Sequence, residues 1–312
     1  MKTNQKKIGA AIIIITMIIV LGYIAKIRFN QTQAIQNTSS KPQIVTSFYP
    51  LYFFTSQIAL DKADVYNITP AGAEPHDYEP STQDMTKIEN STILVLNGGK
   101  LEAWGDKIKE NLKDKKTLII TAGKDIANQQ VTEDNQIIQD PHIWLDPMLA
   151  KKEVELITQG LIKIDPVNSN YYQTNAQNLL VKLDNLNIEY RQGLNSCVKK
   201  DIITSHAAFG YLASEYHLNQ IPISGLSPDA EPTVKKIIEI ANFAKKNQIK
   251  YIFFESLVSP KLSQTIASEI AAQTLVLNPI EGLSDEEIKN GKNYFTEMES
   301  NLNNLKIALQ CQ

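Results

Sequence analysis

The sequence predicts an α/β protein with two Rossmann-like lobes, mostly parallel sheets and one long rigid linking helix, with a metal site in the cleft between the lobes. Two patterns predict this fold class. Short β-rich runs alternate with amphipathic stretches from Gln43 onward, and about thirty residues near the middle of the chain hold no strand candidate. With 312 residues, 43% of them hydrophobic, the chain has material for two domains and is unlike collagen-like, disordered or small disulfide-rich proteins.

The first 28 residues are predicted to be a secretory signal or an uncleaved membrane anchor. Three lysines precede an apolar run over 8–25, and one lysine and one arginine close it. Eighteen helical residues span about 27 Å, close to the hydrocarbon core of a bilayer. No small-x-small cleavage motif follows, which favours an anchor with its N-terminus inside; a buried core helix is the alternative. Residues 29–42 are polar and read as a spacer.

The charge of the body limits its partners. Five of the 31 basic residues lie in residues 1–30 with no acid, which leaves 26 basic against 34 acidic residues, a net charge of −8. An acidic body lacks the basic footprint of a nucleic-acid-binding protein, so we expect no nucleic acid partner.

The predicted location is extracytoplasmic, in the periplasm or on the outer face of the cell membrane. Cys197 and Cys311 are then an even pair in an oxidising compartment. A disulfide between them would tie the end of the chain to its middle and constrain the unfolded chain by up to about 4–5 kcal/mol. Two separate buried thiols are the alternative.

The strands are predicted in order along two lobes, 43–164 and 196–312. The β-rich runs are 44–49, 65–69, 92–97 and 117–121 in the first lobe, and 201–205, 220–224, 251–255 and 274–278 in the second. Segments 233–246 and 260–272 have helical periodicity. This alternation of strand and helix is typical of parallel sheets.

One long helix over 165–195 is predicted to join the lobes. Asp165 and Pro166 form a good N-cap and first-turn pair. Apolar residues then recur every three or four positions, at Tyr172, Ala176, Leu179, Leu183, Leu186 and Tyr190. A single helix predicts a stiff connection with limited hinge motion.

Three of the four histidines lie where an α/β fold binds ligands. His76 follows the run 65–69, His142 lies in DPHIWLDP, and His206 ends the run 201–205. Ligands of open α/β sheets bind outside the carboxyl ends of the strands. The alternative for each histidine alone is a hydrogen-bonded loop residue. His217, near a helix C-terminus, is predicted to be an ordinary surface residue.

A fourth ligand is predicted at Glu255. This glutamate ends the run YIFFE in the second lobe, where a carboxylate is poorly solvated unless it is paired. Three imidazoles and one carboxylate suit tetrahedral Zn²⁺, whereas Mn²⁺ would require more oxygen ligands. Asp77, Glu79 and Asp146 are placed to orient the imidazoles, and their alternative role is as surface or capping acids.

The motifs resemble the zinc- and manganese-specific solute-binding proteins of ABC transporters. The similar stretches cover nearly all of 43–312 in the family's order: SFYPLYFFTSQIA (47–59), GAEPHDYEPSTQDMTKI (72–88), LVLNGGKLEAW (94–104), DPHIWLDP (140–147), TSHAAFGYLA (204–213), ISGLSPDAEPT (223–233), FFESLVSPK (253–261) and LNPIEGLSDEE (277–287). The resemblance implies two lobes joined by a rigid helix.

The resemblance also implies a ligand set and a set of partners. It carries the metal ligands to His76, His142, His206 and an acid of the second lobe, assigned to Glu255, with Glu281 and Asp285 as alternatives. Manganese-binding members tend to have Glu in place of the third His, so this chain resembles the zinc branch. The implied protein is a monomer without catalytic residues that carries Zn²⁺ as cargo to an ABC permease and its ATPase subunit.

The chain departs from the family pattern at two places. Residues 123–139 contain no histidine, whereas many zinc-binding members have a His-rich loop there. No cysteine follows the apolar N-terminal run, so lipid attachment is excluded and tethering is predicted through the N-terminal helix.

Three other functions stay open from the sequence. A Mn²⁺- or Fe²⁺-binding protein of the same class is the first alternative, and a surface adhesin is another. A zinc hydrolase would need an open coordination position, and the sequence has neither an HExxH motif nor a nucleophile elbow.

Overall fold

The computed structural model describes residues 41–133 and 136–312, together with Gly22. The predicted N-terminal anchor and nearly all of the spacer therefore lie outside the described residues. Within those residues no helix combines the length and the apolar character of a membrane span. Residues 42–312 form one compact unit.

The N-terminal lobe is built on a parallel four-stranded sheet with the order β2-β1-β3-β4. Its strands are β1 (Gln43–Thr46), β2 (Asp64–Asn67), β3 (Ile93–Leu96) and β4 (Leu118–Thr121). The central strand ILVL is buried on both faces, which explains its unbroken apolar sequence. Ile93 and Val95 pack into the main core. Leu94 and Leu96 point to the other face, where they pack with Ile88, Ile108 and Leu112.

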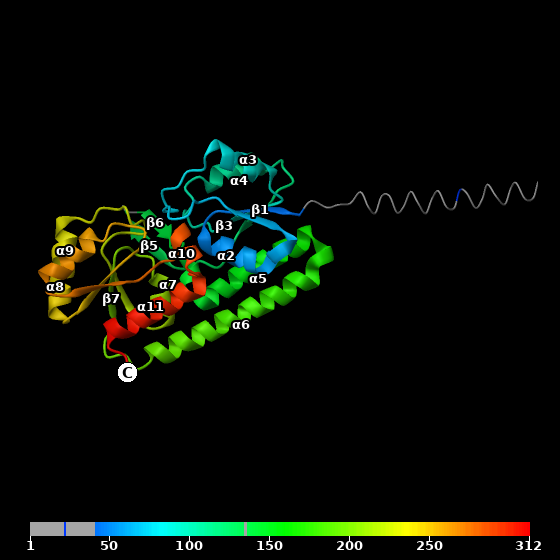
Figure 1. The fold of residues 1–312 in the computed structure, drawn as a ribbon. Coiled ribbons are helices and arrows are strands. Elements are labelled where there is room, and N and C mark those ends of the chain that lie inside the picture. The colour runs from blue at the N-terminus through cyan, green and yellow to red at the C-terminus, as the bar shows by residue number, and fades with distance from the viewer. Residues whose placement is uncertain (1–21, 23–40, 134–135) are drawn as a thin grey trace, which may run out of the picture. The chain divides into compact units, whose positions relative to one another are not determined.

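Helices cover both faces of this sheet. They are α2 (Tyr49–Ala59), α3 (Thr82–Asn90), α4 (Gly105–Leu112) and α5 (Pro147–Ile164), with a short 3₁₀ turn η1 (Leu60–Lys62) after α2. Ser81 and Asp84 form a capping box that starts α3, as their spacing in the sequence requires. Figure 1 shows α3 and α4 together at one side of the lobe.

The C-terminal lobe holds two parallel strand pairs, β7–β8 and β9–β10, and β7 lies beside β9. The strands are β7 (Asp201–Thr204), β8 (Asn219–Pro222), β9 (Tyr251–Phe254) and β10 (Gln273–Val276). Its helices are α7 (Gly210–Glu215), α8 (Val234–Lys246), α9 (Lys261–Glu269), α10 (Asp285–Lys289) and α11 (Tyr294–Leu309). The predicted fold class is confirmed.

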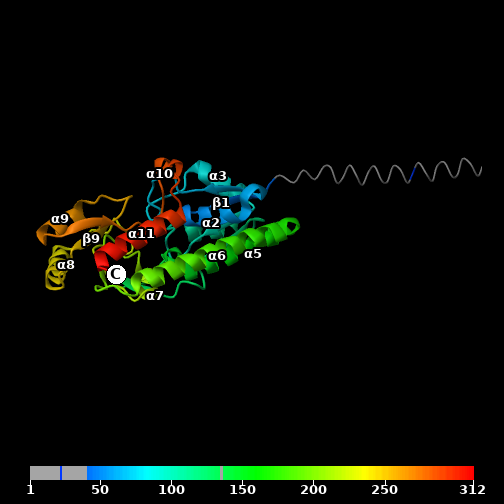
Figure 2. The same cartoon turned by 60° about the horizontal axis from the view of Figure 1, so that its bottom comes forward.

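The predicted linking helix is α6 (Ser169–Leu194), and all six residues of its apolar stripe are buried. Its start is later than predicted because Pro166–Asn168 form a 3₁₀ turn, η3. Asp165 does not cap this turn with its side chain; its carboxylate accepts hydrogen bonds from Asn168 and Tyr172. Figure 2 shows α6 running beside α5, which precedes it in the chain.

One continuous apolar core joins the lobes. It includes Ile44 and Phe48 from the first lobe, Ile202 and Phe253 from the second, and the buried face of α6. Residues of α11 also belong to it. Because the lobes share this core, their relative movement is opposed by loss of buried apolar surface.

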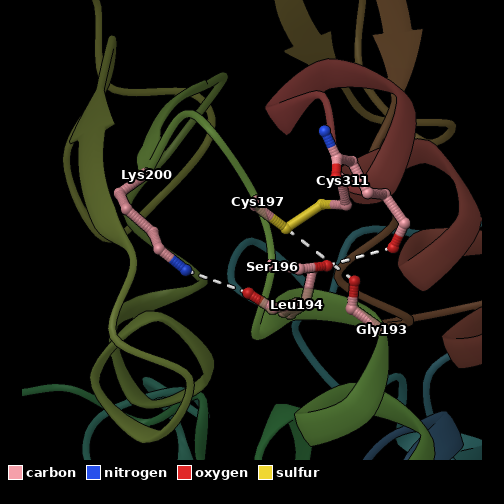
Figure 3. The surroundings of a disulfide bond; sticks show 7 residues. Gly193, Leu194, Ser196, Cys197, Lys200 and Cys311 are labelled. Atoms are coloured by element: carbon pink, nitrogen blue, oxygen red, sulfur yellow. Dashed lines mark hydrogen bonds between the residues drawn. A yellow bond between two sulfur atoms is a disulfide. The ribbon is translucent and has the colours of Figure 1, made fainter.

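The disulfide between Cys197 and Cys311 is confirmed. It ties the C-terminus of α11 to the segment that follows α6 (Figure 3). Backbone bonds reinforce it, since Lys199 N–H donates to Leu309 O at 3.0 Å. The end of the chain is therefore fixed to the linking helix.

A small hairpin was not predicted in 123–139. Strands β5 (Gln130–Glu133) and β6 (Gln136–Gln139) pair antiparallel. Ile137 is 73% exposed, so the hairpin does not bury an apolar face on that side. Without such burial there is no apolar alternation for the sequence to display.

Candidate metal centre

Three imidazoles and one carboxylate converge at the junction of the lobes. Nε2 of His142 lies 3.3 Å from Nε2 of His76 and 3.3 Å from Nε2 of His206. Oε1 of Glu281 lies 3.3, 3.2 and 3.4 Å from Nε2 of the same three rings, taken in the order 76, 142 and 206. The side chain of His76 is 8% exposed and the other three are fully buried.

His76 comes from the loop between β2 and α3. The start of this loop is fixed to the residue that follows β1, because the Thr69 hydroxyl donates to Ser47 O at 2.7 Å. Its end is fixed at α3, where the Tyr78 hydroxyl donates to Asp84 at 2.6 Å. The motif HDYEPSTQD therefore contains the ligand candidate together with the residues that close its loop.

His142 is held from behind by Asp140. Oδ1 of Asp140 accepts the backbone N–H of His142 at 2.9 Å and lies 2.7 Å from its Nδ1. Both groups are buried. A carboxylate at Nδ1 keeps the proton on that nitrogen and leaves the Nε2 lone pair directed at the centre.

The NGGKLE segment supports the Asp140 turn. Asn97 donates its side-chain N–H to Pro141 O at 2.9 Å, and the buried Glu102 carboxylate accepts the backbone N–H of Asn97 at 2.7 Å. Gly98 and Gly99 have φ values of +86° and +63°. A side chain at Gly99 would also lie 3.2 Å from Pro141, so glycine fits this approach best.

His206 is held in the same way by Glu255. Oε1 of Glu255 lies 2.7 Å from Nδ1 of His206 and accepts its backbone N–H at 3.2 Å. The two residues follow the adjacent strands β7 and β9, so the parallel sheet brings their ends together. Burial opposes the charged imidazole, but the charges of Glu255 and Glu281 raise the pKa of His206 well above its usual value.

Glu281 lies in the segment 277–283 after β10. Burial alone would raise its pKa, but His206, His142 and His76 together hold the pKa of this carboxyl well below its usual range. Its Oε2 is buried and has no hydrogen-bond partner among the described residues. A second acid, Glu74, lies close to the site, and burial and the charge of Glu281 raise its pKa to about 9.

The arrangement requires a cation at its centre. With Nδ1 of His142 and His206 donating to carboxylates, two lone pairs and the Glu281 carboxylate face one another at 3.2–3.4 Å. Such groups repel unless protons or a metal ion lie between them. A tetrahedron with zinc–ligand bonds of about 2.0–2.1 Å has six edges of about 3.3–3.4 Å, so the five separations of 3.2–3.4 Å match five of its six edges. The sixth pair, Nε2 of His76 and His206, lies within 4.8 Å.

The structure brings together three of the four ligands predicted from the sequence. His76, His142 and His206 converge, but Glu255 stands behind His206, and Glu281, named above as an alternative, takes the fourth corner. Asp285, the other alternative, is an exposed first residue of α10. The reason is topological, because Glu255 directly follows β9 whereas Glu281 lies five residues beyond β10.

None of the three acids predicted to orient the imidazoles does so. Asp77 hydrogen bonds to Asp229, which raises the pKa of Asp77 to about 6. Glu79 is exposed, and Asp146 caps α5 by accepting the N–H of Met148 at 2.8 Å. Asp140 was not predicted in this role, although an acid two residues before His142 was the available signal.

A two-lobed α/β protein with this buried cluster is a metal-binding protein of the solute-binding type. The chain belongs to the family described as zinc-uptake complex component A, periplasmic, whose model matches residues 44–308. The resemblance found in the motifs is thereby confirmed.

Individual relatives cover most of the chain. The high-affinity zinc uptake system protein ZnuA of Bacillus subtilis (strain 168) is 40% identical over 280 residues, 86% of this chain and 88% of that protein. The zinc-binding lipoprotein AdcA of Streptococcus pneumoniae is 40% identical over 89% of this chain, which spans only 57% of that relative's length. The Zn(II)-bound ZnuA-like domain of the pneumococcal AdcA superposes with a TM-score of 0.76 at 41% identity, covering 86% of this chain and 99% of that domain.

Proposed function

We propose that this protein captures Zn²⁺ outside the cytoplasm and delivers it to an ABC permease that works with an ATPase subunit. The observation that carries the proposal is the match between the separations of 3.2–3.4 Å in the cluster and the edges of a zinc tetrahedron. Membership of the zinc-uptake family and the zinc-bound state of the pneumococcal relative support it.

The proposed ligands are Nε2 of His76, His142 and His206 and the carboxylate of Glu281. Glu255 and Asp140 are proposed as partners that orient His206 and His142 through Nδ1. Two ligands come from each lobe, so a bound ion links the lobes.

Zinc is proposed over manganese on the chemistry of the donors. Three imidazole nitrogens and one carboxylate form a tetrahedral set that suits Zn²⁺, whereas Mn²⁺ favours octahedral oxygen ligands. Release then requires that one ligand leave the ion or that protons compete for the imidazoles.

Binding without catalysis is proposed for the same site. A catalytic zinc keeps one position open for water or substrate, whereas the proposed set of three imidazoles and one carboxylate supplies all four ligands of a tetrahedral ion. Zinc-dependent hydrolysis of esters or peptides by the purified protein would contradict this part of the proposal.

An extracytoplasmic location is supported by the disulfide, since such bonds persist in oxidising compartments. The family description, which names a periplasmic component, agrees. Tethering through residues 1–28 is a proposal from the sequence, and fractionation of cells followed by detergent extraction tests it.

The deciding experiment is a metal competition. The full-length protein is purified in detergent, stripped with a chelator and reloaded from equal concentrations of Zn²⁺ and Mn²⁺, and its metal content is measured. We expect one zinc per chain, lost in His76→Ala and in Glu281→Ala. His217 is exposed and lies just beyond α7, so His217→Ala is the matched control and should keep one zinc.

Two results would contradict the proposal. Stoichiometric manganese would assign the chain to another metal. Full zinc binding by Glu281→Ala together with its loss in Glu255→Ala would restore the ligand set predicted from the sequence.

A further inference from the structure

The backbone just before Glu281 is strained. Ile280 has a φ of +61°, in the left-handed region that β-branched residues rarely adopt. Such a conformation is energetically unfavourable and persists only where surrounding contacts impose it. Its side chain is fully buried, so the strain lies inside the protein and next to the proposed zinc ligand.

A buried asparagine holds this conformation. Oδ1 of Asn278 accepts the backbone N–H of Ile280 at 2.8 Å, and its Nδ2 donates to Glu297 of α11 at 3.0 Å. Asn278 is 1% exposed, so water does not compete for the hydrogen bonds of its side-chain amide. Both ends of the side chain are thus used to fix the turn.

A second asparagine fixes the backbone of Asn278 itself. Oδ1 of Asn301, on α11, accepts the backbone N–H of Asn278 at 2.8 Å, and its Nδ2 donates to Asn278 O at 2.7 Å. This bidentate pairing repeats the pattern that an adjacent strand would supply. The segment is therefore docked on α11 as if on a sheet edge.

The carbonyl of Pro279, the residue after Asn278, is hydrogen bonded to the turn that carries His142. The indole N–H of Trp144 donates to Pro279 O at 2.7 Å, and the Tyr294 hydroxyl of α11 donates to Trp144 O at 2.6 Å. Helix α11 thus contacts the Glu281 segment and the His142 turn at once.

We propose that Asn278 and Asn301 are positioning residues that hold the Glu281 carboxylate against the three imidazoles and thereby set the affinity for zinc. This inference rests on the proposed function, because it takes Glu281 as a zinc ligand. The two asparagines do not touch the ion. They keep a strained turn closed so that the carboxylate needs no rearrangement when zinc binds.

The test compares three alanine variants, each of which removes an asparagine side chain that hydrogen bonds to the backbone of the segment 276–280. Asn278→Ala and Asn301→Ala should each weaken zinc binding by about tenfold or more, the range found for partners that orient metal ligands. Asn304 lies one turn further along α11 and donates to Val276 O at 2.9 Å, before the strained turn. Asn304→Ala is the matched control and should change the affinity by less than about threefold. The dissociation constant is measured on the full-length protein in detergent by competition with a chromophoric chelator.

A double-mutant cycle separates positioning from general loosening of the fold. If the asparagines act through Glu281, the weak zinc binding left to the three imidazoles in Glu281→Ala, measured against a low-affinity chelator, should not fall further when Asn278→Ala is added. The Co²⁺-loaded Asn278→Ala protein should also show weaker visible bands, since their intensity reports tetrahedral coordination. Metal-free melting curves identify any variant that does not fold. If Asn278→Ala does not fold, Asn301→Ala replaces it in the double-mutant cycle, because that variant keeps the hydrogen bond between Asn278 and Ile280.

The outcomes distinguish the two proposals. Unchanged zinc affinity in a folded Asn278→Ala protein, or an equal loss with and without Glu281, overturns the positioning role and leaves the ligand assignment standing. Unchanged affinity in Glu281→Ala overturns the ligand assignment, and the positioning role falls with it.

Discussion

The two buried histidines of the site are held differently from the third. His142 and His206 each place Nδ1 2.7 Å from a buried carboxylate, whereas the His76 ring lies on a loop and remains 8% exposed. Burial lowers the pKa of His76, while carboxylates raise the pKa of the other two against the effect of burial. Two imidazoles are therefore oriented before zinc arrives, and we infer that His76 is the ligand that yields first when zinc leaves.

The largest expected effect is the loss of an oriented ligand. His206→Ala should weaken zinc binding by more than about 100-fold, because orienting partners alone are worth about 10–100-fold. His76→Ala should also lose tight zinc binding. Its loss of affinity should be smaller than that of His206→Ala, because the His76 ring is less well oriented before zinc binds. Competition with chelators of graded affinity measures both. A larger loss for His76→Ala would reverse the comparison.

The next effect concerns the carboxylates behind the rings. Glu255→Gln and Asp140→Asn should each weaken zinc binding by about 10–100-fold while the protein still binds one zinc. The exposed Glu79, which the sequence predicted in this role, supplies the control, and Glu79→Gln should leave the dissociation constant unchanged. Calorimetric titration of the three variants decides between the two assignments.

Proton release on zinc binding is the third expected effect. The raised pKa of His206 favours the protonated ring in the metal-free protein, and zinc must displace that proton. Affinity should therefore rise with pH up to the pKa of His206, by about tenfold per pH unit for each proton released. Glu281→Gln removes one of the charges that raise this pKa and should reduce the release. Titrations in buffers of different ionisation enthalpy count the protons; equal heats in all buffers would contradict the prediction.

Most of the fold was predictable because strands β1, β3, β7 and β9 are largely buried and therefore apolar. Burial makes the run ILVL wholly apolar, and it makes apolar residues recur every three or four positions along α6. Both patterns can be recognised in the sequence. The hairpin β5–β6 could not be predicted in this way, since Ile137 faces solvent and the sequence of β6, QIIQ, does not alternate between apolar and polar residues.

The site was predictable to the extent that each proposed ligand lies in a motif that can be recognised locally in the sequence. The three histidines follow strands or lie in distinctive motifs, so their convergence was predicted correctly. The fourth corner depends on how far a segment runs beyond its strand, and no period in the sequence encodes that distance. Glu255 and Glu281 are both buried acids in the same lobe, and only the fold separates the one at Nδ1 from the one at Nε2.

The smallest expected effect tests whether the histidines are what keeps a buried carboxylate charged. Glu153 on α5 is fully buried like Glu281, but neither of its oxygens has a hydrogen-bond partner in the described part of the chain. Burial raises its pKa well above the usual value, opposite to the direction found at Glu281. The unfolded chain therefore loses this proton at lower pH than the folded protein, and the carboxyl destabilises the fold progressively as pH rises above about 4.5.

Glu153→Met replaces this group with an apolar side chain of similar size and should raise the free energy of unfolding at pH 7 by about 1–3 kcal/mol. The advantage should widen as the pH rises from 5 to 8, until the pKa of the folded state is reached. Glu155, exposed on the same helix, supplies the control, and Glu155→Met should change the free energy of unfolding at pH 7 by less than about 0.5 kcal/mol. Urea unfolding of the metal-free protein measures both. A pH-independent gain at Glu153 would mean that its carboxyl is charged in the folded protein without any imidazole, and the contrast with Glu281 would then not be due to the histidines.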